Sequence, residues 1–307
     1  MAARHFLSIA ELSREELSAL LDAADDAKQG APRWRSRIEG KHVALIFEKP
    51  STRTRVSFEV AVTAMGGHAL VLRGDELQLG RGETIEDTGK VLSRYVDALV
   101  VRTHEHERLE RLSASASVPV INALSDFSHP CQCLADLQTI RAAKGGLDRV
   151  ALAYVGDGNN VAHSLMFGGA TMGMRVRVAS PRGYEPDAVV TERARATAAD
   201  SGGEVLVTNV VAEAAHGADV LYTDVWASMG HEAEVDDRAA AFERYALTSD
   251  VVALAADDAI VMHCLPAHRG EEIAADVIDG PQSVVWDQAE NRLHSQKALL
   301  AWLLAGD

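Results

Sequence analysis

Short apolar runs alternate with helical patterns along almost the whole chain, and this alternation constrains the fold more than any other feature. Each run is too short for a helix and is typical of a buried strand. Strands separated by helices pair in parallel and carry helices on the faces of their sheet. The sequence therefore predicts an α/β fold. The predicted strands are residues 43–47, 68–72, 98–101, 118–123, 150–155, 176–180, 204–208, 219–224, 259–263 and 283–286.

The glycine pair at 145–146 separates two series of strands and helices, so we expect a domain boundary there. Residues 9–29 have the pattern of an amphipathic helix with a capping box at Ser13 and Glu16. A long helix is predicted over residues 288–304. A helix after the first strand should pack its apolar side chains, which are Val56, Phe58, Val60, Ala61, Ala64 and Met65.

The composition narrows the class of protein. A formal charge of −15, from 30 basic and 45 acidic residues, argues against a nucleic-acid partner, which needs a basic face. The three cysteines are an odd number and do not form a disulfide framework. The first residues lack the apolar core of a signal peptide, and no apolar run approaches the ~18 residues of a membrane span. We expect a cytoplasmic enzyme.

The turn after the first strand has the features of an anion site. Pro50 disfavours helix before it and Ser51 is a natural N-cap, so a helix should begin at Ser51 or Thr52. A helix N-terminus offers backbone N–H groups and partial positive charge to a phosphate. The alternative is an ordinary capped helix with two surface arginines. The side chains that can add donors or charge are Ser51, Thr52, Arg53, Thr54 and Arg55.

Other polar residues follow strands of the first series. Arg102 ends the third strand, where ligands of parallel sheets gather, although a surface ion pair is the alternative. His129 and Gln132 are three residues apart across a predicted helix start, so both can face one ligand. Cys131 and Cys133 could suggest zinc, but a second close ligand pair is missing.

Two further segments leave alternatives open. The loop at 73–82 contains three glycines, and its Gln78 and Arg81 could contact a ligand or belong to a solvated loop. Residues 156–161 resemble a dinucleotide fingerprint but have Val161 in place of the third glycine, which argues against a dehydrogenase. That turn still places Asn159 and Asn160 at a helix N-terminus, which suits a carboxylate.

The last strands of the second series also end in polar residues. Asp224 could bind an ammonium group or be a solvated loop carboxylate. The charged segment at 231–244 is predicted to be exposed and mobile. Pro266, just after an apolar strand, should turn the backbone groups of Cys264 and Leu265 outward.

Four motifs together resemble the aspartate/ornithine transcarbamoylase family, and within it the members that use ornithine. They span most of the chain. The first two are shared across the family, and the last two indicate ornithine as the acceptor. The motifs are Ser51-Thr52-Arg53-Thr54-Arg55, His129-Pro130-Cys131-Gln132, Asp224-Val225-Trp226-Ala227-Ser228-Met229-Gly230 and His263-Cys264-Leu265-Pro266.

The resemblance implies two doubly wound, Rossmann-like parallel-sheet domains. Residues 1–146 would bind carbamoyl phosphate, and residues 147–287 would bind ornithine. The C-terminal helix, 288–307, would cross back to the first domain. Family members are trimers or multiples of trimers, so a homotrimer is expected, with Gln78 supplied by the neighbouring chain. The role of Arg81 stays open. A cis Leu265–Pro266 bond is also implied.

The resemblance also assigns roles to these residues. The carbamoyl group would pass from carbamoyl phosphate to the δ-amine of L-ornithine, giving L-citrulline and phosphate, with no cofactor or metal. Arg102, His129, Asp224 and Cys264 would be catalytic. Ornithine would contact Asn160, Asp224, Ser228 and Met229. Carbamoyl phosphate would contact Ser51, Thr52, Arg53, Thr54, Gln78, Arg102, His129, Gln132, Cys264, Leu265 and Arg292.

Two alternatives remain beside this interpretation. The acceptor could be aspartate, putrescine or an acetylated ornithine, although aspartate would call for a basic group where Asp224 stands. A non-catalytic phosphate- or amino-acid-binding module would keep the fold without the chemistry.

Overall fold

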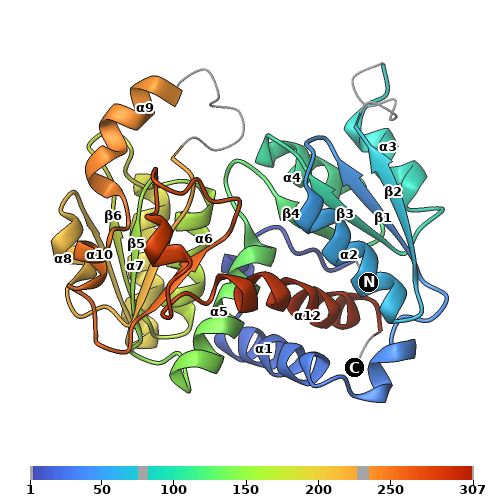
Figure 1. The fold of residues 1–307 in the computed structure, drawn as a ribbon. Coiled ribbons are helices and arrows are strands. Elements are labelled where there is room, and N and C mark those ends of the chain that lie inside the picture. The colour runs from blue at the N-terminus through green and yellow to red at the C-terminus, as the bar shows by residue number, and fades with distance from the viewer. Residues whose placement is uncertain (1–2, 75–81, 227–234, 306–307) are drawn as a thin grey trace. The chain divides into compact units, whose positions relative to one another are not determined.

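The computed structural model describes residues 3–74, 82–226 and 235–305, and its elements form two compact units (Figure 1). The first comprises Met1–Gln138 and Glu290–Asp307, and the second comprises Thr139–Ala289. Every strand pair of the two described sheets is parallel, which confirms the predicted fold class. Among the described residues, no helix combines the length and the apolar character needed to cross a membrane.

The first unit contains a four-stranded sheet with the order β2-β1-β3-β4. The central strands are buried along nearly their whole length, as expected for parallel strands covered on both faces. The elements that begin in this unit are η1 (Ile9–Glu11), α1 (Arg14–Lys28), η2 (Pro32–Ser36), β1 (His42–Phe47), α2 (Thr52–Ala64), β2 (His68–Arg73), α3 (Ile85–Leu92), β3 (Ala98–Arg102), α4 (His106–Ser115), β4 (Val120–Leu124) and α5 (Pro130–Lys144).

The predicted helix starts are confirmed at two positions. Ser13 and Glu16 form the expected capping box, although α1 begins at Arg14 and residues 9–11 form the separate turn η1. Ser51 is the N-cap of α2, and its Oγ accepts a hydrogen bond from the backbone of Thr54 at 3.4 Å. Both caps satisfy N–H groups that a helix start leaves without intrahelical partners.

The predicted packing of α2 is only partly correct. Phe58 is buried, but Val56 and Val60 are 51% and 45% exposed and Ala64 is exposed as well. The reason is the helical period: Phe58, with Thr54 and residues 61, 62 and 65, lies on the face that packs inward, and the two valines lie on another face.

The second unit contains a five-stranded sheet with the order β7-β6-β5-β8-β9. Apolar residues of β5, β8 and β9 form a core with α8, α11 and the start of α12. Its elements are β5 (Ala151–Val155), α6 (Asn160–Thr171), β6 (Arg175–Ala179), α7 (Ala188–Ser201), β7 (Glu204–Thr208), α8 (Val211–Ala215), β8 (Val220–Thr223), α9 (Val235–Phe242), η4 (Glu243–Tyr245), α10 (Ser249–Val252), β9 (Ile260–His263), α11 (Ala275–Ile278) and the start of α12 (Val285–Leu304).

One prediction for this unit is wrong and another is only partly correct. Residues 283–286 are not a strand: Ser283 makes one isolated bridge to Val261, and α12 already begins at Val285. The predicted exposure of 231–244 holds for Glu243 and Arg244 but fails for Arg238 and Phe242, which are both buried on α9. Residues 231–234 of this prediction lie outside the described residues. A charged side chain can be buried where an ion pair compensates its charge, and Arg238 forms such a pair with Asp157.

Candidate functional site

In the first unit, three polar segments meet at one edge of the sheet. Ser51 follows β1, Arg102 ends β3 and His129 follows β4, and these three strands are neighbours in the sheet. The carboxyl ends of parallel strands lie at the same edge, so the sheet order brings these residues together. Phe47 and Arg102 are directly paired in the register of β1 and β3.

Arg292 of α12 contacts two other predicted site residues of this unit, Thr54 and Gln132. Its Nη2 donates to Thr54 Oγ1 at 3.2 Å and its Nη1 to Gln132 Oε1 at 2.6 Å. Gln132 in turn donates from Nε2 to Asp136 Oδ1 at 2.8 Å. All four side chains are buried. The amide of Gln132 is therefore held with its oxygen toward the guanidinium, and that oxygen has a second lone pair for a ligand N–H.

His129 is buried next to several positively charged groups. Its pKa is well below the ordinary value, first because burial disfavours the imidazolium and then because of Arg292, Arg102 and Arg53. The imidazole is therefore neutral at physiological pH and can offer one N–H to an oxygen atom. Arg53 is exposed on the first turn of α2, where it can reach an incoming anion.

The cysteines on α5 do not behave as zinc ligands. Burial raises the pKa of Cys131 to about 12 and raises that of Cys133 well above its usual range. Zinc binds the thiolate form, which these environments disfavour. Within the described part of the chain, neither cysteine belongs to a cluster of metal-ligand groups.

In the second unit, the predicted acceptor residues also follow neighbouring strands. The turn after β5 leads into α6, where Asn159 is the N-cap and accepts from Val161 N at 2.9 Å. Gly158 has no room for a side chain, since a Cβ there would lie 2.1 Å from Pro186 N. Asn160 begins α6 and is buried. Asp224 follows β8, the sheet neighbour of β5.

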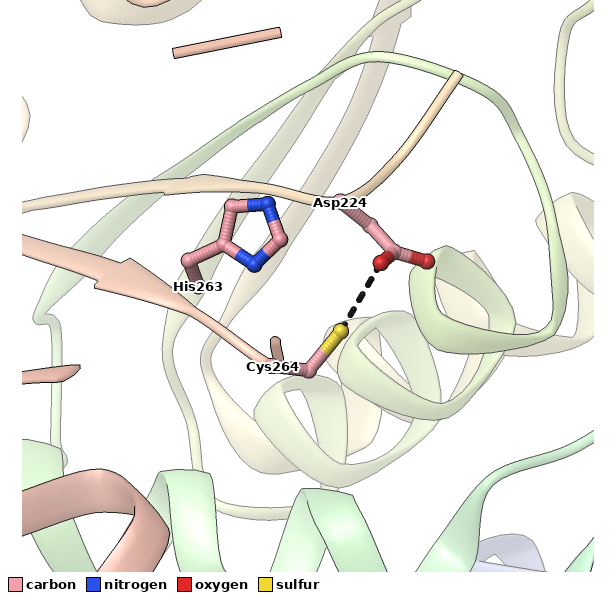
Figure 2. A group of neighbouring side chains, drawn as sticks. All are labelled: Asp224, His263 and Cys264. Atoms are coloured by element: carbon pink, nitrogen blue, oxygen red, sulfur yellow. Dashed lines mark hydrogen bonds between the residues drawn. The ribbon is translucent and has the colours of Figure 1, made fainter. Parts of the chain in front are cut away.

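Asp224 receives a hydrogen bond on each carboxylate oxygen. Cys264 Sγ donates to Oδ1 at 2.9 Å (Figure 2), and Asn159 Nδ2 donates to Oδ2 at 3.1 Å. These bonds orient the carboxylate at the carboxyl edge of the sheet, where an ammonium group could bind. The contribution of Asn159 was not predicted, because the sequence pattern does not distinguish which of two adjacent asparagines caps the helix.

His263 lies beside this pair (Figure 2). Both of its ring nitrogens have contacts with other residues. Its Nδ1 accepts from Leu265 N at 2.8 Å, and its Nε2 lies 3.1 Å from Glu272 Oε1. Asp224, His263 and Cys264 have ligand atoms within 4.8 Å of one another, but the imidazole has no nitrogen left for a metal.

Glu272 was missed by the sequence analysis. Burial would raise its pKa, but the bonds from His263 and the backbone of His268 outweigh burial and keep the pKa below its ordinary value. The carboxylate therefore stays charged and fixes the ring of His263. In the sequence, a histidine at the end of a predicted strand, followed nine residues later by an acid, could have suggested this pair.

The backbone after β9 has the expected irregularity. The Leu265–Pro266 bond is cis, and Leu265 has a φ of 58°. Three predicted ligand residues, Gln78, Ser228 and Met229, lie outside the described residues, as does Arg81.

The fold and these two sets of residues define a two-unit α/β transferase, and the comparison with family models agrees. Residues 4–142 match the carbamoyl-phosphate-binding domain and residues 148–303 match the Asp/Orn-binding domain of aspartate/ornithine carbamoyltransferase. The chain belongs to this family.

Comparison with individual members of the family shows which of them the chain resembles. It is 62% identical to an ornithine carbamoyltransferase of Parafrankia sp. over 99% of this chain and 97% of that protein. The structure of ornithine carbamoyltransferase from Pyrococcus furiosus has a TM-score of 0.96 at 54% identity, covering 100% of this chain and 98% of that one. An acetylornithine transcarbamylase complexed with acetylcitrulline has a TM-score of 0.88 at 32% identity, covering 98% and 99%.

Proposed function

We propose that the chain transfers the carbamoyl group of carbamoyl phosphate to the δ-amine of L-ornithine, giving L-citrulline and phosphate. The observation that carries this proposal is the neutral, buried His129 among the guanidinium groups of Arg53, Arg102 and Arg292. Such a site suits a doubly charged phosphate next to a carbonyl oxygen that must be polarised. The names of the relatives support ornithine as the acceptor.

The donor would bind at the carboxyl edge of the first sheet. Its phosphate would accept from the first turn of α2, from residues 51–54 and from Arg53, where the N-terminal N–H groups add partial positive charge. Thr54, Arg102 and His129 would donate to the carbonyl oxygen. Gln132, with the Cys264 and Leu265 backbone groups, would hold the carbamoyl NH2.

The acceptor would bind at the carboxyl edge of the second sheet. Asn160 and the Met229 N–H would hold its carboxylate, and Asp224 and Ser228 its α-ammonium group. The δ-amine must lose a proton before it attacks, because an ammonium group of pKa near ~10.4 has no lone pair to donate. Attack forms the C–N bond, the C–O bond to phosphate breaks, and the departing phosphate can take the proton.

The donors on the carbonyl oxygen would stabilise the oxyanion that develops during attack. A preorganised donor of this kind contributes about 3–4 kcal/mol to the transition state. A neutral imidazole gives its N–H without adding a further charge to the arginine cluster. The low pKa of His129 is therefore consistent with a donor role and argues against a role as a general acid.

We propose that residues 1–146 with 288–307 form the donor domain and residues 147–287 the acceptor domain. The limits of the two family matches support a boundary near Gly146. Three free cysteines suit a reducing compartment, which supports the cytoplasm as the location.

A homotrimer with Gln78 from the neighbouring chain is also proposed. Exposed apolar residues support it: Val56 and Val60 lie one turn apart on an exposed face of α2. Such a face is typical of an interface between copies. Light scattering should give three copies for the wild type and fewer for Val60→Glu, and a monomeric wild type would refute this part.

The proposed activity is tested by citrulline formation in matched variants. Arg53→Ala should lower kcat/KM by about 10²- to 10³-fold, the loss expected for one preorganised donor. Arg111→Ala is the control, because Arg111 is an exposed arginine of the same unit that pairs with Glu86 at 2.8 Å and has no place in the proposed site. Equal activity of the two variants would contradict the donor site.

An acceptor panel tests the second half of the proposal. Ornithine, N-acetylornithine, putrescine and aspartate are compared at one concentration of carbamoyl phosphate. N-acetylornithine belongs in the panel because one related structure is an acetylornithine transcarbamylase. Ornithine should be the preferred acceptor, and carbamoyl phosphate binding without any product would instead indicate a non-catalytic binding module.

A further inference from the structure

A second group of candidate metal ligands lies in the turn after β9, apart from the Asp224–Cys264 pair. His268, Glu271 and Glu272 have ligand atoms within 4.8 Å of one another. The turn is closed by Glu271 N, which donates to His268 O at 3.0 Å, and by Gly270, whose φ is +92°. His268 and Glu271 are exposed, whereas Glu272 is completely buried.

The buried carboxylate of Glu272 is satisfied on one oxygen only. Oε1 lies 2.6 Å from the donor His268 N and 3.1 Å from His263 Nε2. Oε2 is buried and has no hydrogen-bond partner in the described part of the chain. It lies 3.6 Å from His268 Nδ1. A buried charged oxygen without a hydrogen bond is costly, so this atom calls for a cationic partner.

The distances match those between ligands of one small ion. His268 Nδ1 lies 3.6 Å from Glu272 Oε2 and 3.8 Å from Glu271 Oε2. Ligands bound about 2.0–2.2 Å from a shared ion lie about 3–4.4 Å apart, so these atoms need little movement. The entry side is open, because two of the three side chains are exposed.

We propose that His268, Glu271 and Glu272 bind a divalent transition-metal ion, with water completing the coordination. One imidazole and two carboxylates suit Zn²⁺ or Mn²⁺ better than Ca²⁺ or Cu⁺. Glu272 is already oriented by His263, the kind of outer contact that fixes a metal ligand. The Asp224 cluster differs, because both nitrogens of its histidine have other contacts. This site is independent of the proposed carbamoyl transfer.

The experiment is calorimetric titration of the chelator-treated full chain with Zn²⁺. The variants are Glu271→Gln and His268→Gln, which change exposed side chains. Glu192→Gln is the control, since it removes an exposed glutamate elsewhere in the second unit. Cys264→Ser removes the thiol of the other cluster and is used for binding only.

One ion per chain should bind to the wild type, to Glu192→Gln and to Cys264→Ser. Binding should weaken in Glu271→Gln and His268→Gln by at least the roughly 10- to 100-fold that loss of an outer contact costs. The absorption spectrum of Co²⁺ bound at this site should lack a thiolate-to-metal charge-transfer band, because no cysteine is among the ligands. Wild-type affinity in both ligand variants, loss of binding in Cys264→Ser, or no binding to the wild type would each overturn the proposal. In the last case a simple ion pair of His268 with the two glutamates would account for the geometry.

Discussion

Replacement of Arg238 by methionine tests whether α9 holds the acceptor site through a buried ion pair. Arg238 Nη1 donates to Asp157 Oδ2 at 2.7 Å and to Trp226 O at 2.8 Å, and the guanidinium lies 5.0 Å from the ring centre of Tyr184. Asp157 belongs to the turn after β5, and Trp226 follows β8. These are the two segments that contribute Asn159 and Asp224.

The expected loss in the free energy of unfolding follows from the burial of the Arg238–Asp157 pair. The two side chains are only 8% and 11% exposed, so solvent screens them little. Removing one partner of a buried pair leaves the other charge without compensation and costs about 3–5 kcal/mol. Arg238→Met should therefore lower the free energy of unfolding by about this amount. Arg238→Met with Asp157→Asn should recover part of the loss, because the double variant has no buried charge to compensate.

An exposed ion pair of the same unit is the control. Arg269 and Asp279 are 42% and 51% exposed, with bonds of 2.7 and 2.8 Å, and Arg269→Met should cost less than about 1 kcal/mol. Urea unfolding at one protein concentration, followed by circular dichroism, compares the variants. In Arg238→Met the KM for ornithine should rise more than the KM for carbamoyl phosphate. Equal stability of Arg238→Met and Arg269→Met would refute the reasoning.

Three further predictions follow from the sites. The pKa of His129 is lower in the folded than in the unfolded chain, so as pH falls below about 6.5 this histidine is protonated in the unfolded chain before it is protonated in the folded one. Wild-type stability should then fall relative to His129→Gln by up to about 1.4 kcal/mol per pH unit until the folded pKa is reached, and parallel pH profiles would contradict this. Native protein should react with a thiol reagent once per chain, at Cys264, because Cys131 and Cys133 are buried with raised pKa values; three reactive thiols before denaturation would refute this. Ser51→Ala should cost about 1 kcal/mol in unfolding experiments and raise the KM for carbamoyl phosphate, whereas an effect on stability alone would limit Ser51 to a cap.

Much of the fold could be predicted because it depends on local patterns. The apolar runs gave the correct positions of β1 to β9, and the cap residues Ser13 and Ser51 marked the starts of α1 and α2. The predictions failed where a local pattern is ambiguous. Residues 283–286 have strand-like composition, but after one bridge at Ser283 the chain already forms the first turn of α12.

The candidate sites were likewise predictable only in part. Motifs alone pointed to Ser51, His129, Asp224 and Cys264, whose binding roles stay predictions. They did not show that Arg292, far along the chain, donates to both Thr54 and Gln132. Nor did they reveal the partners of the buried charged groups, such as Glu272 beside His263.

The sequence by itself determined the alternation of strands and helices, the helix caps and the residue types available at each strand end, because these follow from neighbours along the chain. Only the tertiary structure decided which strand ends are adjacent, which arginines depress the pKa of His129, and which acids contact Arg238 and His263. The physical reason is that burial and electrostatic interaction depend on distance in space, and sheet order brings together residues that the sequence separates widely.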